Sequence, residues 1–295
     1  MQREKGVAQT GQRGQLRGEL RGVVLAVPLQ LPARGQSRRA CVRAFVRVGD
    51  CSCFYNLRVM WCSSQLVPQI QLWARELGFS QIGVAGVDLS SAEPSLLHWL
   101  ERGFHGEMHY MASHGLKRAR PAELVPGTVS VITARMDYLP KTVPPGWQAL
   151  EFERLARPEE AIVSMYARGR DYHKVLRSRL QKLADCIGES VGEFGHRAFT
   201  DSAPVLECEL ASRSGQGWRG KHTLVLNRDY GSMFYLGEIY VDLSLEPTPP
   251  TTGHCGSCMV FMVVCLMLVM VGERQVDARR CMSYLTIEHS GAIPL

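Results

Sequence analysis

The chain has 295 residues, of which 45% are hydrophobic and 21% are charged. A chain of this length and composition can bury one large core or two smaller ones, which excludes a fibrous or wholly disordered protein. No uninterrupted apolar stretch reaches the roughly 18 residues of a membrane-spanning helix, so a polytopic membrane protein is also excluded.

The net charge of +6 is concentrated at one end of the chain. Residues 1–64 contain eleven Lys and Arg against three acidic residues, which gives +8, whereas the other 231 residues sum to −2. This segment is not rich in Ser, and Pro28 and Pro32 interrupt its apolar run, which argues against a targeting peptide. We therefore expect residues 1–64 to be a disordered, solvated basic extension.

Regular patterns begin near Leu66 and continue to about residue 243. Apolar residues spaced three and four apart, with helix-start residues before them and glycines after them, predict helices at 66–77, 91–103, 171–191 and 204–214. Short apolar runs predict strands at 81–87, 129–138 and 161–167, a further strand ending at Thr200, and a hairpin around 227–231. This alternation predicts a mixed α/β domain over residues 65–243, and the Pro-rich segment 246–252 marks its end.

The ten cysteines are scattered unevenly, which fits reduced thiols or metal ligands better than a disulfide framework. Four of them lie in residues 244–295, where Cys255-Gly-Ser-Cys258 forms a CxxC pair and Cys265 and Cys281 follow. This spacing suits zinc, an iron–sulfur cluster, a redox disulfide or free thiols. The uncharged run 259–271 is too short to span a bilayer and predicts a buried helix or an aggregation-prone segment.

Two polar tracts allow more than one interpretation. In Tyr166-Ala-Arg-Gly-Arg-Asp-Tyr-His-Lys174, basic residues near a helix start could bind an anion, but a helix capped by Asp171 explains the same pattern. Asp201-Ser-Ala-Pro204 is likewise an ordinary helix start with Asp201 as the cap. The spacing of His105, His109 and His114 matches no zinc signature, so we expect a polar loop there.

Taken in order along the chain, several motifs together resemble one family. They are His105-Gly-Glu-Met-His-Tyr-Met111, Arg118-Ala-Arg-Pro121, the 166–174 tract, Asp201-Ser-Ala-Pro-Val-Leu-Glu207, Gly217-Trp-Arg-Gly-Lys-His222, Leu236-Gly-Glu238 and Asp277-Ala-Arg-Arg-Cys281. Over residues 66 to 294 the chain resembles the epoxyqueuosine reductases. The resemblance implies a cytoplasmic, cobalamin-dependent iron–sulfur enzyme that performs the last step of queuosine synthesis on tRNA.

The resemblance also implies roles for individual residues. Asp201 takes the place of the catalytic acid above the corrin ring, which outweighs its interpretation as a helix cap. The residues implied to line the cobalamin pocket are Arg120, Ser164 and Tyr166. The cysteines that match cluster ligands are Cys255 and Cys258 for a first 4Fe-4S cluster, and Cys265 and Cys281 for a second.

The chain departs from the family pattern around these cysteines. Phe261 stands where the family has a cysteine, Leu266 stands where it has a proline, and the chain stops at Leu295 before a second cysteine run. Each cluster therefore keeps two of four ligands, and we expect neither to assemble. Residues 1–64 have no family counterpart, so we expect a truncated or frame-altered product without activity.

The resemblance predicts three regions and a set of partners. The regions are a basic extension at 1–64, a mixed α/β cobalamin-binding catalytic domain at 65–243 and an incomplete ferredoxin-like segment at 244–295. The implied chemistry has reduced cobalt engage an epoxide carbon while Asp201 protonates the leaving oxygen. The partners are tRNA carrying epoxyqueuosine and an external low-potential electron donor, for a monomer with no membrane association.

Two alternatives stay open. The chain could be a non-catalytic cobalamin-binding fragment or an inactive gene product. It could also be a zinc-binding interaction protein that uses the four C-terminal cysteines as ligands.

Overall fold

The computed structural model describes residues 63–140, 142–260, 265 and 267–293. The chain divides into two compact units, 1–54 and 55–295, and every described residue belongs to the second. The basic extension predicted for 1–64 therefore lies outside the described residues as far as residue 62. Phe261 and Leu266 also lie outside them.

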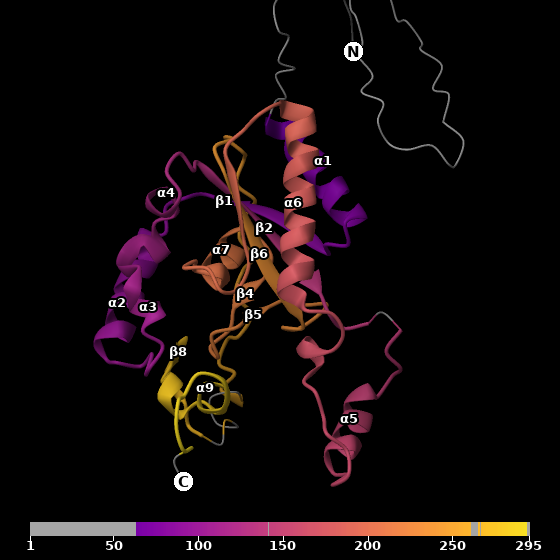
Figure 1. The fold of residues 1–295 in the computed structure, drawn as a ribbon, viewed down its shortest axis with the longest axis vertical. Helices are drawn as coiled ribbons and strands as arrows, with labels where there is room; N and C mark the ends of the chain where they lie inside the picture. Colours follow the sequence, from indigo (N-terminus) through magenta and orange to yellow (C-terminus); the bar gives the residue numbers. More distant parts are fainter. Residues whose placement is uncertain (1–62, 141, 261–264, 266, 294–295) are drawn as a thin grey trace, which may run out of the picture. The chain divides into compact units, whose positions relative to one another are not determined.

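A four-stranded sheet forms the centre of the described unit (Figure 1). Its order is β1 (Gln81–Ala85), β2 (Ser130–Asp137), β6 (Phe234–Val241) and β3 (His196–Phe199), and every neighbouring pair is antiparallel. The mixed α/β fold class is thus confirmed, with a sheet that is antiparallel throughout.

One face of the sheet is covered by two helices, α1 (Ser63–Glu76) and α6 (Tyr172–Val191). The apolar residues of α6 recur every three or four positions, which places Leu176, Leu180, Leu183 and Ile187 on one buried stripe. The predicted cap is confirmed, because the Asp171 side chain accepts a hydrogen bond from the His173 amide. This face is the largest apolar core of the unit.

The other face of the sheet is covered by α7 (Glu207–Arg213), against which the two-stranded sheet of β4 (Trp218–Arg219) and β5 (Val225–Leu226) packs. The end of α7 lies so close to β1 that a Cβ built on Gly83 would be 1.9 Å from the carbonyl oxygen of Ser214. Only glycine fits there. Helix α7 begins at Glu207 and not at the predicted Pro204, so residues 201–206 form a loop.

The predicted hairpin is confirmed as a bridge between Asn227 and Gly231. The strand that follows it, β6, then pairs with β2 and β3, not with β5.

Segments distant in sequence lie beside the central sheet and against each other. Between β1 and β2 the chain forms η1 (Ser90–Ala92), α2 (Glu93–Glu101), α3 (Tyr110–Ser113), η2 (Gly115–Ala119) and α4 (Pro121–Leu124). The C-terminal part forms β7 (Met270–Gly272), β8 (Gln275–Val276), η4 (Ala278–Arg280) and α9 (Met282–Ile287). Trp99 joins the two parts, since its Nε1 donates to the Val276 carbonyl at 2.7 Å.

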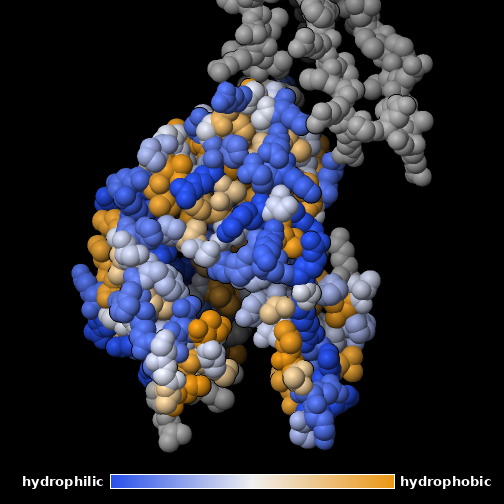
Figure 2. Space-filling model, in the orientation of Figure 1, coloured by the Kyte–Doolittle hydropathy of each residue, from blue (hydrophilic) through white to orange (hydrophobic). Residues whose placement is uncertain are grey.

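The strand predicted at 161–167 is wrong. The segment is irregular apart from the short η3 (Met165–Ala167), and it follows α5 (Trp147–Leu155) in an arm between β2 and α6 (Figure 1). A strand is stable only when a neighbouring strand takes its hydrogen bonds, and no strand of the sheet pairs with this segment. The arm is instead rich in exposed apolar side chains, visible beside hydrophilic ones in Figure 2, among them Leu150, Phe152 and Leu155.

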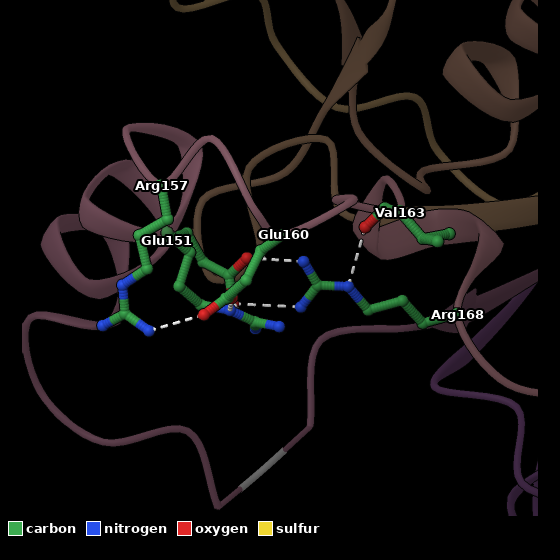
Figure 3. A network of polar contacts seen from close by, with 6 residues as sticks. Glu151, Arg157, Glu160, Val163 and Arg168 are labelled. Carbon is green, nitrogen blue, oxygen red and sulfur yellow. Dashed lines mark hydrogen bonds and ion pairs between the residues drawn. The ribbon is translucent and has the colours of Figure 1, made fainter.

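Ion pairs hold the arm together (Figure 3). The guanidinium of Arg168 binds both carboxylate oxygens of Glu151, at 3.0 and 2.5 Å, and its Nε donates to the Val163 carbonyl at 2.8 Å. Both terminal nitrogens of the Arg168 guanidinium are therefore occupied by the Glu151 carboxylate. This arrangement does not support the anion site considered for the start of the following helix.

The uncharged run 259–271 is mostly exposed where the structure describes it. Met259, Val260, Met267 and Leu268 are exposed, whereas Val269 is buried. Among the described helices, none combines the length and the apolar character needed to cross a membrane.

Candidate functional site

A cavity of about 1100 Å³ opens on the α7 side of the unit. It lies among α2, α3, α7 and the C-terminal strands, and its walls include Trp99, Tyr110, Arg118, Asp201, Glu207 and Arg219. Its volume lies just above the usual range for small-molecule sites, which is about 300–1000 Å³. The cavity therefore suits a large ligand.

Asp201 stands at this cavity on the loop that follows β3. Its Oδ2 accepts a hydrogen bond from the Tyr172 hydroxyl at 2.6 Å and contacts Nε2 of His173 at 2.8 Å. Because α7 begins six residues later and has Leu206 at its N-cap position, Asp201 does not cap that helix. The interpretation of Asp201 as a helix cap is therefore wrong.

The first turn of α6 fixes the two partners of Asp201. His173 is held from its other ring nitrogen, where Nδ1 lies 3.1 Å from Oδ1 of Asp171. The Tyr172 ring stacks on Tyr235 with centroids 4.4 Å apart and an interplanar angle of 5°. Burial, followed by the hydrogen bond to Asp201, raises the pKa of Tyr172, so the phenol stays protonated and donates a hydrogen bond to the carboxylate.

Two further carboxyl groups lie behind Asp201. The backbone amide of Asp201 donates to Oε1 of Glu207 at 2.6 Å. Glu238 on β6 is completely buried, and within the described structure neither of its oxygens has a hydrogen-bond partner. Burial, and then the charges of Glu207 and Asp201, raise the pKa of Glu238 well above the ordinary value, while burial and the charge of Asp201 raise that of Glu207 to about 7.

The sequence analysis assigned no role to Glu207 or Glu238, although both stand in the motifs that carry the resemblance. A signal was present, because Glu238 is the single charged residue of the strand Phe234–Val241. A charge in an otherwise uncharged strand that is buried on both faces indicates a functional or paired group.

The three residues predicted to line a cobalamin pocket are placed differently from one another. Tyr166 lies near Asp201's partners, since its ring contacts Tyr172 edge-on at 6.4 Å and its carbonyl accepts a hydrogen bond from the Tyr235 hydroxyl. Arg120 is ion-paired with Glu93 at 2.7 Å. None of the three, Arg120, Ser164 or Tyr166, is among the residues that line the cavity.

Arg118, two residues before Arg120, does line the cavity. Its guanidinium donates to the carbonyls of Tyr110 at 2.7 Å and Met111 at 3.0 Å.

The four C-terminal cysteines do not converge. Cys255 and Cys258 share a turn in which the Cys258 amide donates to the Cys255 carbonyl at 2.9 Å, and Cys265 and Cys281 are also free thiols. Over the part of the chain that the structure describes, no three His, Cys, Asp or Glu side chains are grouped as a metal site. A four-thiolate cluster therefore does not fit the described residues, and the same holds for a zinc site made of these cysteines.

Comparison with known proteins gives concordant matches. A family model described as epoxyqueuosine reductase QueG, DUF1730, matches residues 118–202. The epoxyqueuosine reductase of Alicycliphilus denitrificans is 77% identical over 235 residues, covering 80% of this chain and 65% of that protein. The Burkholderia pseudomallei epoxyqueuosine reductase is 56% identical over 250 residues, covering 78% of this chain and 61% of that protein.

Solved structures agree with these sequence matches. The epoxyqueuosine reductase of Streptococcus thermophilus superimposes with a TM-score of 0.67 at 27% identity, covering 78% of this chain and 60% of that one. A crystal structure of epoxyqueuosine reductase with an epoxyqueuosine-modified tRNA-Tyr stem loop gives 0.64 at 26% identity, covering 79% and 60%.

The chain spans 61 to 65% of the length of the two curated relatives, just under two thirds. Within that span the ordered motifs, the fold and the identities agree. The chain belongs to the epoxyqueuosine reductase family.

Proposed function

We propose that this chain carries the catalytic domain of an enzyme that reduces epoxyqueuosine in tRNA to queuosine, with Asp201 as the proton donor. The observation that carries the proposal is the position of Asp201, on the wall of a large cavity and held by Tyr172 and His173. Support comes from the relatives that bear this name and from the relative crystallised with an epoxyqueuosine-modified stem loop.

The reaction requires an acid. Converting the epoxide to an alkene breaks both carbon–oxygen bonds, forms a carbon–carbon double bond and releases the oxygen as water, so it consumes two electrons and two protons. An alkoxide is a poor leaving group near neutral pH, and a carboxyl group at hydrogen-bond distance can protonate the oxygen as it departs. Since Tyr172 and His173 both approach Oδ2, we assign the transferred proton to Oδ1 of Asp201.

The cavity fits cobalamin as the large ligand. Besides its volume, it has Arg219 in its wall, whose Nε is buried and has no hydrogen-bond partner among the described residues, as expected where a polar group of a ligand docks. Arg118 and Arg219 would hold polar groups of the cofactor, and Tyr166, Arg120 and Ser164 are proposed as further contacts. When bound, cobalamin supplies electrons to the epoxide carbon.

The electron supply is a separate part of the proposal. Cys255, Cys258, Cys265 and Cys281 are proposed as the retained cluster ligands, but the described residues do not bring them together. No step is assigned to a cluster, and the proposed electron source is an external low-potential donor. The site would act in the cytoplasm, where queuosine-bearing tRNA is made and thiols stay reduced.

The test is Asp201→Asn in a chain extended by the part of the 77% identical relative that it does not span. Phe261 is also replaced by Cys, so that the cysteines that the family resemblance implies are present. Turnover is measured as conversion of epoxyqueuosine-tRNA to queuosine-tRNA by nucleoside mass spectrometry, and cobalamin binding by absorbance titration. We expect about 10²-fold or greater loss of turnover with nearly unchanged cobalamin affinity, the usual scale for a general acid.

A matched control is Asp185→Asn, a carboxylate exposed on α6. Turnover of Asp201→Asn within about threefold of the control would show that Asp201 is not the acid. If the unsubstituted chain shows no saturable change in the cobalamin spectrum, the assignment of the cavity is wrong.

A further inference from the structure

Three carboxyl groups from three elements meet on the α7 side of the sheet. Asp201 comes from the loop after β3, Glu207 is the first residue of α7, and Glu238 comes from β6. The strand register brings them together, because Glu238 lies directly opposite Phe199, two residues before Asp201. Of the three, Asp201 and Glu207 reach the cavity.

The backbone of Asp201 is held in an unusual conformation. Its φ is +45°, in the left-handed region that residues other than glycine adopt at a cost. Such a conformation persists only when the surroundings hold it. The visible restraint is the hydrogen bond from the Asp201 amide to Oε1 of Glu207 at 2.6 Å, which closes the loop 201–206 onto the start of α7.

The strength of this restraint depends on the charge of Glu207. A backbone amide bonds more strongly to an ionised carboxylate than to a neutral carboxyl group. Burial and the charge of Asp201 raise the pKa of Glu207 to about 7, whereas the hydrogen bond from the Asp201 amide lowers it, since it favours the ionised form. Both protonation states are therefore populated near neutral pH.

Other titratable groups face Glu207 from each neighbouring element. They are Tyr172 and His173 on α6, Cys208 on α7, and Glu238 and Tyr240 on β6, while Arg219 on β4 interacts with Cys208. Burial raises the pKa values of Tyr172, Cys208 and Tyr240, so these three stay neutral at pH 6 to 8. Burial also raises the pKa of Glu238 well above its ordinary value, which favours its neutral form.

We propose that Glu207 is the positioning residue of Asp201, a clamp on the backbone of loop 201–206 that is tight when the Glu207 carboxylate is ionised and looser when it is protonated. The proposal rests on the proposed role of Asp201 as the proton donor, because the clamp sets where that side chain stands in the cavity. It adds a proton-linked control of the loop that presents the acid.

The test is amide hydrogen exchange of Asp201 in the full ¹⁵N-labelled chain, without cobalamin or tRNA, from pH 6 to 8. Rates are expressed as protection factors, which removes the intrinsic pH dependence of exchange. In the unsubstituted chain we expect the protection factor to rise by about fivefold or more, because the acceptor becomes charged. In Glu207→Gln the side-chain oxygen still accepts the hydrogen bond but cannot ionise, so protection should be present and independent of pH.

Two further variants complete the design. Glu207→Leu removes the acceptor and should lose the protection at every pH. Glu193→Gln changes an exposed carboxylate outside the cluster and should behave as the unsubstituted chain.

A pH-dependent rise that survives in Glu207→Gln overturns the proposal, because the effect then comes from a group other than Glu207. Protection that survives in Glu207→Leu overturns it as well. If Glu207→Leu does not fold, the flat profile expected of Glu207→Gln still decides the question. Since exchange needs no cofactor or substrate, a failed clamp leaves the reductase proposal intact, and an active Asp201→Asn enzyme leaves the exchange result intact.

Discussion

Both faces of the central sheet are covered, but the covering of one is almost wholly apolar, whereas that of the other mixes a smaller apolar cluster with buried polar groups. On the face toward α1 and α6, Ile132 and Ala134 of β2 and Ile239 of β6 pack against the apolar stripe of α6. On the face toward α7, Thr133 and Arg135 of β2 are as deeply buried.

The polar face carries internal hydrogen bonds. The Thr133 hydroxyl lies 2.6 Å from that of Ser214, and Nε2 of Gln216 donates to the Thr133 carbonyl at 3.2 Å. Other buried atoms of this face, such as both oxygens of Glu238 and the Tyr240 hydroxyl, have no partner in the described structure. Apolar burial stabilises the fold, whereas an unpartnered polar group costs free energy. The comparison teaches that the face toward α1 and α6 supplies stability and that the α7 face uses part of it to hold buried polar groups beside Asp201.

The largest effect on stability is expected on the apolar face. Leu180→Ala removes a side chain that is fully buried between α6 and Gly237 of β6. It should lower the free energy of unfolding by about 2–5 kcal/mol, the cost of lost burial and of the cavity left behind. Urea denaturation followed by circular dichroism measures it. Leu72→Ala on α1, where the side chain is 51% exposed, is the control and should change little. Equal effects of the two variants would contradict the assignment of this face as the core.

The buried carboxyl groups on the α7 face should make the free energy of unfolding depend on pH. Because burial raises the pKa of Glu238 above the ordinary 4.5, the folded state holds a proton that the unfolded chain releases. The stabilisation that comes from this bound proton is complete below about pH 4.5. As the pH rises above that value, the free energy of unfolding falls by about 1.4 kcal/mol per pH unit for as long as Glu238 stays protonated in the folded state. Glu207, with a pKa of about 7, lowers the free energy of unfolding in the same way as the pH rises from 4.5 to 7.

Glu238→Gln removes one of these two titrations. The fall in unfolding free energy between pH 5 and 7 should become less steep by about 1 kcal/mol per pH unit, as measured by urea denaturation at each pH. The exposed Glu193→Gln should leave the slope unchanged. A slope in Glu238→Gln equal to that of the unsubstituted chain would show that Glu238 is not protonated in the folded state.

The smallest effect is expected outside both faces, in the arm of Figure 3. Glu151→Gln breaks the two-point contact with Arg168, but the pair is partly exposed and lies away from the sheet. We expect no measurable change in the unfolding midpoint of the unit, and about twofold faster proteolysis within residues 156–168 at low salt. High salt should abolish the difference. A lowered midpoint would mean that the arm belongs to the cooperative core.

The sequence predicted the apolar face well, because its signals are local. Helix α6 was predicted over 171–191 and is found at Tyr172–Val191 with Asp171 as its cap. Strand β2 was predicted over 129–138 and is found at Ser130–Asp137. Periodic spacing, a capping side chain and short apolar runs act within a few residues of each other, so they can be read without knowing the rest of the chain.

The sequence failed where the outcome depends on a distant partner. Residues 161–167 have the composition of a strand, but no strand pairs with them. Thr133, Arg135 and Asp137 alternate with apolar residues in β2, a pattern typical of a solvent-facing side, yet α7 and the segment after it cover Thr133 and Arg135.

The candidate site likewise has one part that the sequence predicted and another part that depends on distant contacts. The motifs were sufficient to single out Asp201 and the tract that contains its partners, and the resemblance they carry was sufficient to indicate the family. Strand order β1-β2-β6-β3 alone decides that Glu238 lies opposite Phe199 and behind the loop of Asp201. Residue 238 becomes a neighbour of residues 201 and 207 through pairing and packing of elements far apart in the chain, and those contacts have no local signature that the sequence could display.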